Sequence, residues 1–297
     1  METGRHVPVL LEEAIDFLRI QRGGTYVDCT VGLGGHSLEI AKRLGAQGHL
    51  IGFDKDTNAL GIARKRLTEP PAELAGNWPT VTLIHGSFAE VGERVPVASA
   101  DGMLADLGVS SLQLDDAARG FSFQAEGPLD MRMNPQAELD ADQVVNRLDE
   151  RTLADVIYEF GEERRSRRIA RAIVRARPIR STAHLAQVVA AAARPMKFER
   201  IHPATRTFQG IRIYVNRELE DLKRLVGDAP KALKKGGRLA VISFHSLEDR
   251  IVKEALREGA QRGLWEILTK KPVTAKEEEI DRNPRSRSAK LRAAERK

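Results

Sequence analysis

The stretch from Thr25 to Asp54 most constrains what this chain can fold into. It opens with an apolar run, 25–29, that is short enough to be a buried strand. A glycine turn at 32–35 leads into a helical pattern over 37–44, and a second apolar run then ends on Asp54. Strand, glycine turn, helix, strand and acidic residue in this order predict half of a nucleotide-binding α/β fold.

Each part of this stretch has a physical role. Gly34 and Gly35 allow a sharp turn and leave space for a ligand to approach main-chain N–H groups. The helix that follows presents unpaired N–H groups and a partial positive charge at its start, which suits a carboxylate or a phosphate. Asp54, at the end of the second strand, can accept hydrogen bonds from a ribose diol.

The glycine turn differs from the dinucleotide-binding fingerprint in two places. Ser37 stands where the fingerprint has its third Gly or an Ala, and Asp28 at the end of the first strand would repel a pyrophosphate. A carboxylate there instead attracts a cation. S-adenosylmethionine carries a sulfonium, an amino group, a carboxylate and a ribose but no phosphate, so we favour it over NAD as the cofactor. The alternative is that the turn is only a tight connection.

Composition limits the class of protein and its partners. The 297 residues suffice for one large or two ordinary domains. The net charge of +6 and the pI of about 9.5 favour a polyanionic partner, although an ordinary basic protein remains the alternative. A single cysteine, Cys29, excludes an internal disulfide and any multi-cysteine metal site, so we expect no metal.

The chain shows no targeting or membrane signal. Its first twenty residues contain four acidic side chains and no long apolar core, so we expect no signal peptide. No apolar run approaches the roughly 20 residues needed to span a bilayer. We therefore expect a cytoplasmic protein with no membrane partner, and the sequence does not give its oligomeric state.

Further strands are predicted at 81–84, 101–106 and 237–243, separated by helices or loops. This alternation predicts an α/β fold with a doubly wound, mostly parallel sheet. Between 112 and 203 the pattern is loop-rich and then helical, which indicates a helical domain inserted into an α/β domain formed by 1–111 and 204–297.

Three details of the return to the α/β domain are also expected. A long helix over 205–225 leads back to the sheet. A later helix begins at Ser246, which we expect to be its N-cap. The segment 289–294 near the end of the chain is either an edge strand or disordered.

The carboxyl ends of the strands locate a ligand site in an open α/β sheet. Asp106 is the strongest candidate there, because burying an unpaired carboxylate is costly and rarely serves packing alone. Phe88 can pack against adenine or simply fill the core, and Asp56 competes with Asp54 for the ribose. The other residues that follow strands are Asp28, His36, Phe244 and His245.

The predicted insert carries an unusual charge pattern. Between Arg164 and Arg180 there are eight arginines and no acidic residue. Four of them recur at helical spacing and share one helix face: Arg164, Arg168, Arg171 and Arg175. Such a stripe can contact successive phosphates, so we favour RNA or DNA as partner over a solvated surface. The segment 202–209 opens a helix with two possible caps and the exposed-looking Arg206, so it serves either a binding function or helix capping.

Six long motifs together resemble the bacterial small-subunit ribosomal RNA cytosine-N4 methyltransferase family (RsmH, also called MraW). They are Gly34-Gly35-His36-Ser37; Asp106-Leu107-Gly108-Val109-Ser110-Ser111 with Gln113-Leu114-Asp115; Arg119-Gly120-Phe121-Ser122-Phe123; Gly127-Pro128-Leu129-Asp130-Met131-Arg132-Met133; 202–209; and 243–250. Because they occur in order from the start of the chain to about Arg285, the resemblance is specific.

This resemblance implies a Rossmann-like class I methyltransferase fold with an inserted substrate-recognition domain. It implies S-adenosylmethionine as methyl donor and a decoding-centre cytosine of 16S rRNA, within the small ribosomal subunit, as target. Carried onto matching positions, it places cofactor contacts at Gly34, Gly35, His36, Asp54, Phe88, Asp106 and Gln113.

Several aspects of the chemistry stay open. Asp106 is a candidate acceptor for the proton of the target amine, unless it holds the amino group of the cofactor. His245 is either a second acceptor or a residue that shapes its loop. Phe121, Phe123 and Phe244 are candidates for stacking on the target base. A DNA amino-methyltransferase and an assembly factor that binds RNA without catalysis are the alternatives. The first lacks support because the Pro-Pro-aromatic motif is missing after Asp106.

Overall fold

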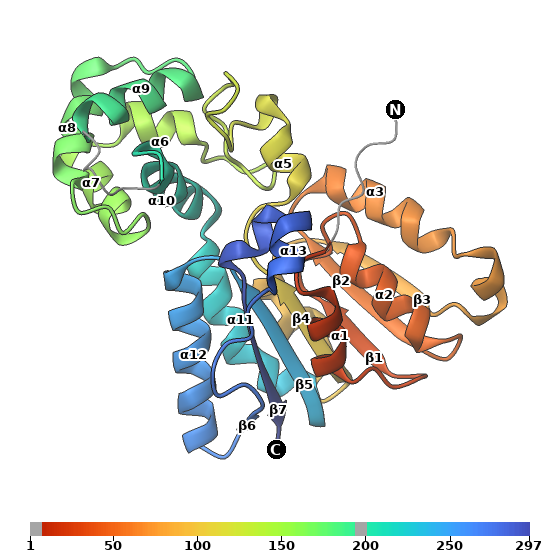
Figure 1. Ribbon diagram of the computed structural model, residues 1–297. Coiled ribbons are helices and arrows are strands. Elements are labelled where there is room, and N and C mark those ends of the chain that lie inside the picture. The colour runs from red at the N-terminus through yellow and green to blue at the C-terminus, as the bar shows by residue number, and fades with distance from the viewer. Residues whose placement is uncertain (1–7, 194–200) are drawn as a thin grey trace. The chain divides into compact units, whose positions relative to one another are not determined.

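The computed structural model describes residues 8–193 and 201–297 (Figure 1). The chain divides into two compact units, which we describe separately. The first unit combines Met1–Gly108 with Leu219–Lys297, and the second is Val109–Glu218. The expected insert, 112–203, falls within the second unit.

The first unit is built on a seven-stranded sheet of order β3-β2-β1-β4-β5-β7-β6. Its strands are β1 (Thr25–Asp28), β2 (His49–Asp54), β3 (Thr80–His85), β4 (Ala100–Asp106), β5 (Leu233–Ser243), β6 (Trp265–Ile267) and β7 (Lys290–Arg296). Strands β1 to β5 pair in parallel, whereas β7 pairs antiparallel with both β5 and β6. The prediction of a mostly parallel sheet is confirmed.

Helices cover both faces of this sheet. They are α1 (Leu11–Leu18), α2 (Gly35–Leu44), α3 (Thr57–Thr68), α4 (Val91–Arg94), α11 (Glu218–Ala232), α12 (Ser246–Gln261) and α13 (Glu277–Arg282). Successive strand residues point to opposite faces. Accordingly, Tyr26 packs in one core with residues of α1, α2 and α3. Its neighbour Val27 packs in another core with residues of α4, α11 and α12. The sheet is therefore doubly wound, as predicted.

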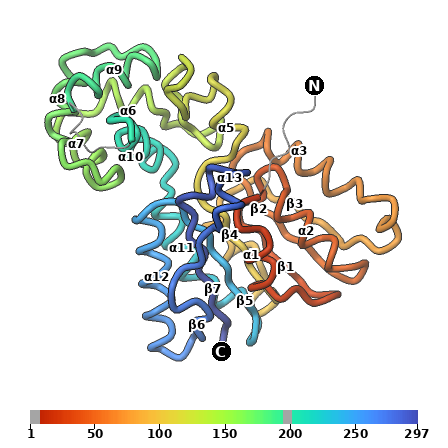
Figure 2. Tube along the Cα trace, viewed as in Figure 1, coloured from red at the N-terminus to blue at the C-terminus, as the bar shows by residue number. Residues whose placement is uncertain are grey.

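The last strand differs from its prediction. The segment expected to be an edge strand or disordered forms β7, which lies between β5 and β6 (Figure 2). Ala293 pairs with Ala240 of β5, and Ala294 pairs with Ile267 of β6. The four residues 291–294 are buried, which explains why a short apolar segment in a polar tail is held in the sheet.

In its described part the second unit contains α-helices and 3-10 turns and no strand. Its helices are α5 (Ser111–Asp115), α6 (Ala141–Arg147), α7 (Glu150–Glu159), α8 (Ser166–Ala176), α9 (Thr182–Ala192) and α10 (Ala204–Asn216). They enclose a core of their own, with Leu153, Ile169 and Ile211 fully buried. No helix in the described ranges of either unit is long and apolar enough to cross a membrane.

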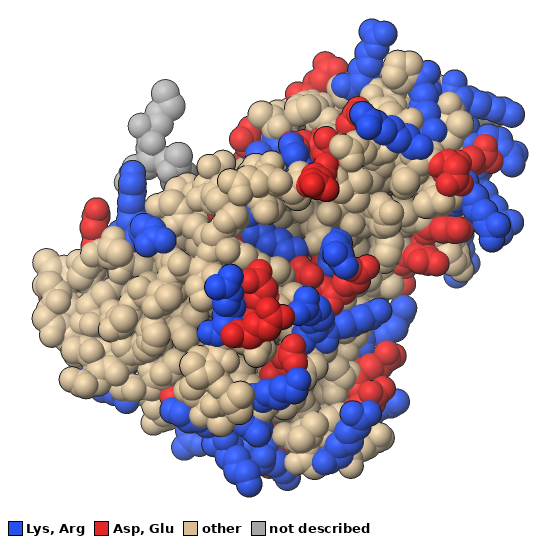
Figure 3. Space-filling model, turned by 180° about the vertical axis from the view of Figure 1, so that it is seen from behind, with Lys and Arg blue, Asp and Glu red and all other residues tan. Residues whose placement is uncertain are grey.

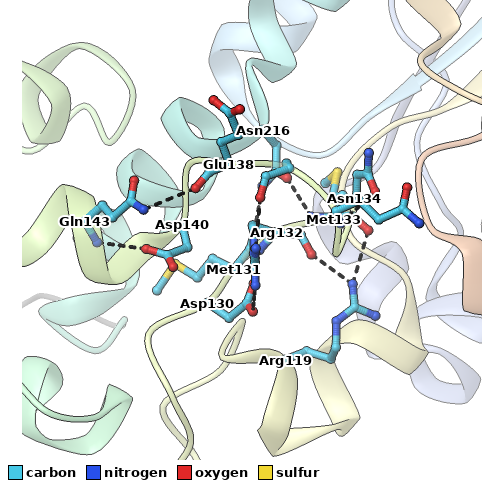
Figure 4. Close-up of polar contacts among 12 residues, drawn as sticks. Arg119, Asp130, Met131, Arg132, Met133, Asn134, Glu138, Asp140, Gln143 and Asn216 are labelled. Carbon is cyan, nitrogen blue, oxygen red and sulfur yellow. Dashed lines mark hydrogen bonds and ion pairs between the residues drawn. The ribbon is translucent and has the colours of Figure 1, made fainter.

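The expected long helix over 205–225 is wrong, because α10 ends at Asn216 and Arg217 adopts a left-handed conformation (φ 53°). The Asn216 side chain accepts a hydrogen bond from Met133 N at 2.6 Å and donates one to Met131 O at 2.7 Å (Figure 4). Two further bonds join Arg212 to Glu218 across the break, at 2.8 and 2.9 Å. These contacts, to a distant loop and across the turn, stabilise the interruption between α10 and α11 at Arg217.

Candidate active site

The glycine turn brings the start of α2 to the carboxyl end of β1. Gly34 precedes the helix with φ 80°, a left-handed conformation that strains any residue with a Cβ. A Cβ on Gly35 would lie 2.5 Å from Pro8 Cγ, so only glycine fits there without a shift. The turn predicted from sequence is therefore required by the backbone and by a close contact.

Three carboxylates lie around this turn, at the ends of β1, β2 and β4. Asp28 accepts hydrogen bonds from Thr30 N at 3.0 Å and from Ser37 Oγ at 2.5 Å. The backbone N–H of Asp106 donates to Thr30 Oγ1 at 2.7 Å, which ties β4 to the turn. The structure thus brings together strand-end residues that the sequence separates widely.

Asp54 is fixed by two main-chain donors. Its Oδ2 accepts from Gly32 N at 2.7 Å, and its Oδ1 accepts from Asp56 N at 2.8 Å. Asp56 has a different role, because its buried side chain caps α3 by accepting from Asn58 N and Ala59 N. Since Asp56 is used as a cap, the geometry favours Asp54 over Asp56 for a ligand at this strand end.

Burial raises the pKa values of all three carboxylates. It raises the pKa of Asp28 to about 6 and that of Asp54 to about 6, against the hydrogen bonds that stabilise their charged forms. Burial also raises the pKa of Asp106 well above its usual range, and the negative charges of Asp28 and Glu248 add to this effect. Acids that repel one another in this way favour a cationic ligand and disfavour a phosphate.

This arrangement fits the charged end of S-adenosylmethionine. Asp106 Oδ1 is buried and has no hydrogen-bond partner among the described residues. A buried acceptor without a donor is costly unless a ligand supplies one. S-adenosylmethionine carries an ammonium and a sulfonium, and such positive charges are what a cluster of buried carboxylates attracts.

His36 joins the cluster from the first turn of α2. Its ring is buried, with Nε2 3.1 Å from Val9 O and Nδ1 3.6 Å from Asp106 Oδ2. The Val9 carbonyl can only accept, so Nε2 carries a proton and Nδ1 faces Asp106. His36 therefore lies beside Asp106, and its imidazole can attract this carboxylate when Nδ1 is also protonated.

The loop after β5 is held by Glu248, a residue that the sequence patterns had not singled out. Buried Glu248 accepts hydrogen bonds through Oε2 from Phe244 N at 2.8 Å and from His245 N at 3.3 Å. In return, His245 Nδ1 accepts from Glu248 N at 3.5 Å. The expectation that Ser246 caps α12 is wrong, because the cap is His245. A Glu three residues after a cap is the signal of a capping box, and it could have identified Glu248.

Both ring nitrogens of His245 face α12. Besides the Nδ1 contact, His245 Nε2 lies 3.2 Å from Glu248 Oε1. Phe244 is half-buried, and its ring would lie 3.5 Å from a Cβ on Gly108, which has φ 95°. This geometry favours a loop-shaping role for His245 and places the Phe244 ring against the backbone that follows Asp106.

Phe88 is half-buried at the start of a 3-10 turn, η2 (Phe88–Glu90), and packs against the core that contains Phe53. The loops that carry Asp54 and Phe88 are joined through α11. Lys55 Nζ and Ser87 Oγ each lie 2.6 Å from Asp221 Oδ2. No sequence pattern reveals this link, because Asp221 is distant in the chain and has the spacing of an ordinary helical surface residue.

Gln113 belongs to the second unit. Its Oε1 accepts from Ser110 N at 3.0 Å, while Gln113 N donates to Ser110 Oγ at 3.3 Å, so the pair forms a capping box at the start of α5. The side chain is buried. Gln113 thus stabilises the start of α5, in addition to the cofactor contact that the resemblance implies.

The arginine stripe lies on and just before α8 in the second unit. Arg164, Arg168, Arg171 and Arg175 are exposed, with Arg164 in the turn that precedes the helix. No acidic residue is interleaved with them in the sequence, but Arg171 Nε lies 3.2 Å from Glu150 Oε1 on α7. Lys and Arg side chains gather over the helical unit at the upper right of Figure 3, with acidic side chains among them.

Arg206 is exposed in the first turn of α10. A Cβ on Gly161 would lie 2.4 Å from Arg206 O, so the end of α7 meets α10 backbone to backbone. Gln209 Nε2 donates to Phe160 O at 3.1 Å beside this contact. Arg206 therefore lies next to the turn from which the arginine stripe starts.

The loop at 127–133 is built rigidly within the second unit (Figure 4). Arg119 donates to the carbonyl oxygens of Arg132 and Met133 at 2.8 and 3.2 Å. Asp130 and Arg132 form a two-bond ion pair at 2.9 and 2.7 Å. Met131 is fully buried with φ 58°, a conformation that such surrounding contacts must hold in place.

Comparison with known proteins places the chain in a family. A family model described as the MraW methylase family matches residues 3–297. The chain is 70% identical, over 299 aligned residues, to a Koribacter versatilis protein named ribosomal RNA small subunit methyltransferase H, covering 100% of this chain and 96% of the relative. An Acidobacterium capsulatum protein of the same name is 64% identical over 297 residues, covering 100% of both chains.

A solved structure titled as a putative rRNA methylase from Clostridium thermocellum is 13% identical with a TM-score of 0.49, covering 98% of this chain and 97% of its own. The family match and the strand order confirm the Rossmann-like class I methyltransferase fold. Since the match spans nearly all residues, and the two relatives align over at least 96% of their length at high identity, this chain belongs to the MraW methylase family.

Proposed function

We propose that this chain methylates the exocyclic N4 amine of a cytosine in the decoding centre of 16S rRNA, within the small ribosomal subunit. Its cofactor is S-adenosylmethionine. The observation that carries the proposal is the 70% identity to a ribosomal RNA small subunit methyltransferase H over the whole chain. The cytosine, its N4 position and the decoding centre follow from the motifs that resemble the family.

Residues of the first unit are proposed to hold the cofactor. Gly34 and Gly35 give it access to the start of α2, and Asp54 accepts from the ribose, since each of its oxygens has a lone pair beyond its main-chain bond. Phe88 packs against adenine, and Asp106, which lies beside His36, is placed at the methyl-transfer end of the cofactor, where it has the two possible roles described below. Gln113, in the second unit, is a further cofactor contact that only the family resemblance implies.

The cofactor, when bound, supplies an electrophilic methyl group on its sulfonium. The N4 lone pair of cytosine is delocalised into the ring, so an acceptor for N4–H is needed to favour attack. Asp106 Oδ1 is the proposed acceptor, because it is buried, lacks a partner among the described residues and has a raised pKa that suits it to take a proton. Holding the cofactor ammonium is the alternative role for the same carboxylate.

The second unit is proposed to bind the RNA backbone. Arg164, Arg168 and Arg175 are exposed, and within the described ranges they form no ion pair with an acidic side chain. Arg206 extends this basic surface, and guanidinium groups suit phosphate oxygens through paired hydrogen bonds. Arg171 joins them if its ion pair with Glu150 exchanges for a phosphate.

A direct test is incubation of the full chain with labelled S-adenosylmethionine and small subunits from cells that lack this modification. Digestion of the 16S rRNA to nucleosides should show label in N4-methylcytidine at the decoding centre. Label in another nucleoside would refute the proposed target, and binding of the cofactor without any transfer would support the assembly-factor alternative.

A further inference from the structure

We propose that His202 and Phe123 form a stacking platform for one unpaired nucleobase of the bound RNA. The inference rests on the proposed function, because it takes RNA as the ligand. It gives a role to the 202–209 motif, which the methyl-transfer chemistry does not use.

Three aromatic rings form a column from the core of the second unit to its surface. Phe208 is buried at 5% exposure, Phe123 is half-buried, and His202 is exposed. The centroids of Phe208 and Phe123 lie 4.9 Å apart in an edge-on arrangement with an interplanar angle of 67°. Those of Phe123 and His202 lie 4.7 Å apart at 36°. One side of the imidazole is therefore covered by Phe123, and the exposed remainder is available to a second planar group.

The His202 ring is also fixed by a hydrogen bond. Its Nδ1 accepts from Ala204 N at 3.2 Å at the start of α10. This bond and the Phe123 contact hold the ring in place before any ligand arrives, so little side-chain entropy is lost on stacking. A ring that served only as a helix cap would not need an aromatic support beneath it.

The surroundings of the column match a single-stranded nucleic acid. Arg206 lies one helical turn after His202, and its carbonyl contacts the turn at Gly161 that leads to Arg164. A stacked base at His202 would thus have basic side chains beside it for its own phosphates. Aromatic platforms next to a basic track are the usual way in which proteins bind unpaired RNA.

The alternative is that His202 only caps α10 while Phe123 covers the core. His202→Asn separates the two roles, because Asn keeps an acceptor for Ala204 N but removes the ring. His184→Asn is the matched control: His184 lies in the same unit, and its Nδ1 accepts from Arg180 N at 3.3 Å. His202→Tyr keeps an aromatic ring and serves as the rescue variant.

The experiment measures binding of the full chain to single-stranded oligoribonucleotides that contain 2-aminopurine, whose fluorescence falls when it stacks on an aromatic ring. We expect the wild type to quench the probe. His202→Asn should lose the quenching and bind about tenfold more weakly, within the range for one stacked base. Its salt dependence should match the wild type, because no phosphate contact is lost. His184→Asn should behave as wild type, and His202→Tyr should restore the quenching.

Two results would overturn the platform. In one, His202→Asn binds and quenches as the wild type does. In the other, the wild type does not quench the probe although small subunits acquire N4-methylcytidine, which leaves the proposed function standing. Failure of the wild type both to bind RNA and to methylate small subunits would instead refute the proposed function together with the platform.

Discussion

The carboxylate of Asp221 lies 2.6 Å from the ammonium of Lys55, and the same oxygen accepts the hydroxyl of Ser87. The ion pair is largely shielded, with side-chain exposures of 19% for Lys55 and 14% for Asp221. Lys55 follows Asp54, and Ser87 precedes Phe88. One side chain on α11 therefore fixes the spacing between the two loops proposed to hold the adenosine of the cofactor.

We predict that Asp221→Asn raises the dissociation constant for S-adenosylmethionine by roughly 5- to 30-fold. The loss of a charged hydrogen-bond acceptor costs about 1–2 kcal/mol at such a site. Calorimetry measures the affinity. Arg224→Gln is the control, because it breaks an exposed ion pair on the same helix, with Glu93 at 3.0 Å. Equal affinities for both variants and the wild type would show that Asp221 does not position these loops.

For Asp106→Asn we expect an intact fold, since the two side chains have nearly equal volumes, and a loss of methyl transfer of about 100-fold or more. Calorimetry and single-turnover kinetics together distinguish its two possible roles. A raised cofactor dissociation constant with near-normal turnover at saturation identifies a cofactor ligand. Normal affinity with a reduced single-turnover rate identifies an acceptor for the target amine.

His245→Asn is the companion variant to Asp106→Asn. Asn is a good helix cap, so it should preserve the start of α12 and most of the activity if His245 only shapes its loop. Full activity of Asp106→Asn, combined with loss of activity in His245→Asn, would reverse the assignment.

Asp28 should make the cofactor-free protein less stable as the pH rises. Burial raises the pKa of Asp28 from 3.8 in the unfolded chain to about 6 in the folded one. The folded state therefore binds the proton more tightly, and its advantage is lost between pH 4 and pH 6 to 7. A shift of about two pKa units corresponds to roughly 3 kcal/mol.

Asp28→Asn removes this titration. Relative to the wild type, we predict that its free energy of unfolding increases by about 2 kcal/mol between pH 4.5 and pH 7.5, measured in urea. Asp16→Asn, on the exposed face of α1, is the control for removing one carboxylate. A difference between Asp28→Asn and the wild type that stays constant with pH would contradict the prediction.

The arginine stripe gives a prediction that can be read from salt dependence. Replacing Arg168 and Arg175 with Gln should weaken RNA binding and reduce the magnitude of the slope of log affinity against log salt by roughly 1.5. The reason is that fewer counterions are released on binding when two phosphate contacts are missing. Arg171 is left in place because Glu150 already pairs with it. Cofactor affinity should not change.

Lys253→Gln with Arg257→Gln is the charge-matched control for this pair. Both side chains are exposed on α12 in the first unit. If the control lowers the slope as much as the Arg168 and Arg175 replacements do, the effect reflects net charge alone, and the stripe is a solvated surface.

Local sequence patterns predicted those parts of the molecule that local forces determine. The strands, the glycine turn and the carboxylates at strand ends follow from apolar runs and their neighbours, so Asp28, Asp54 and Asp106 could be grouped before the structure was known. Asp106 and Asp54 were found because a polar residue that ends an apolar strand is conspicuous.

The errors arose where distant residues decide the outcome. The break at Arg217 depends on Asn216 bonding to the loop at 131–133, which no helical pattern reveals. The ion pair of Arg171 could not be predicted either, because its partner Glu150 lies on another helix. Asp221 could not be assigned to the site, because its partners are more than a hundred residues away in the sequence.

The position of β7 has a consequence for the nascent chain. Strands β5 and β6 emerge from the ribosome before the segment 290–296, yet each pairs with that segment along one side. Until it arrives, both strands have unsatisfied main-chain groups, and an open strand edge is a template for incorrect pairing. The sheet that carries the His245 loop can therefore close only after 290–296 has been made, when this strand is inserted between two that precede it in the chain.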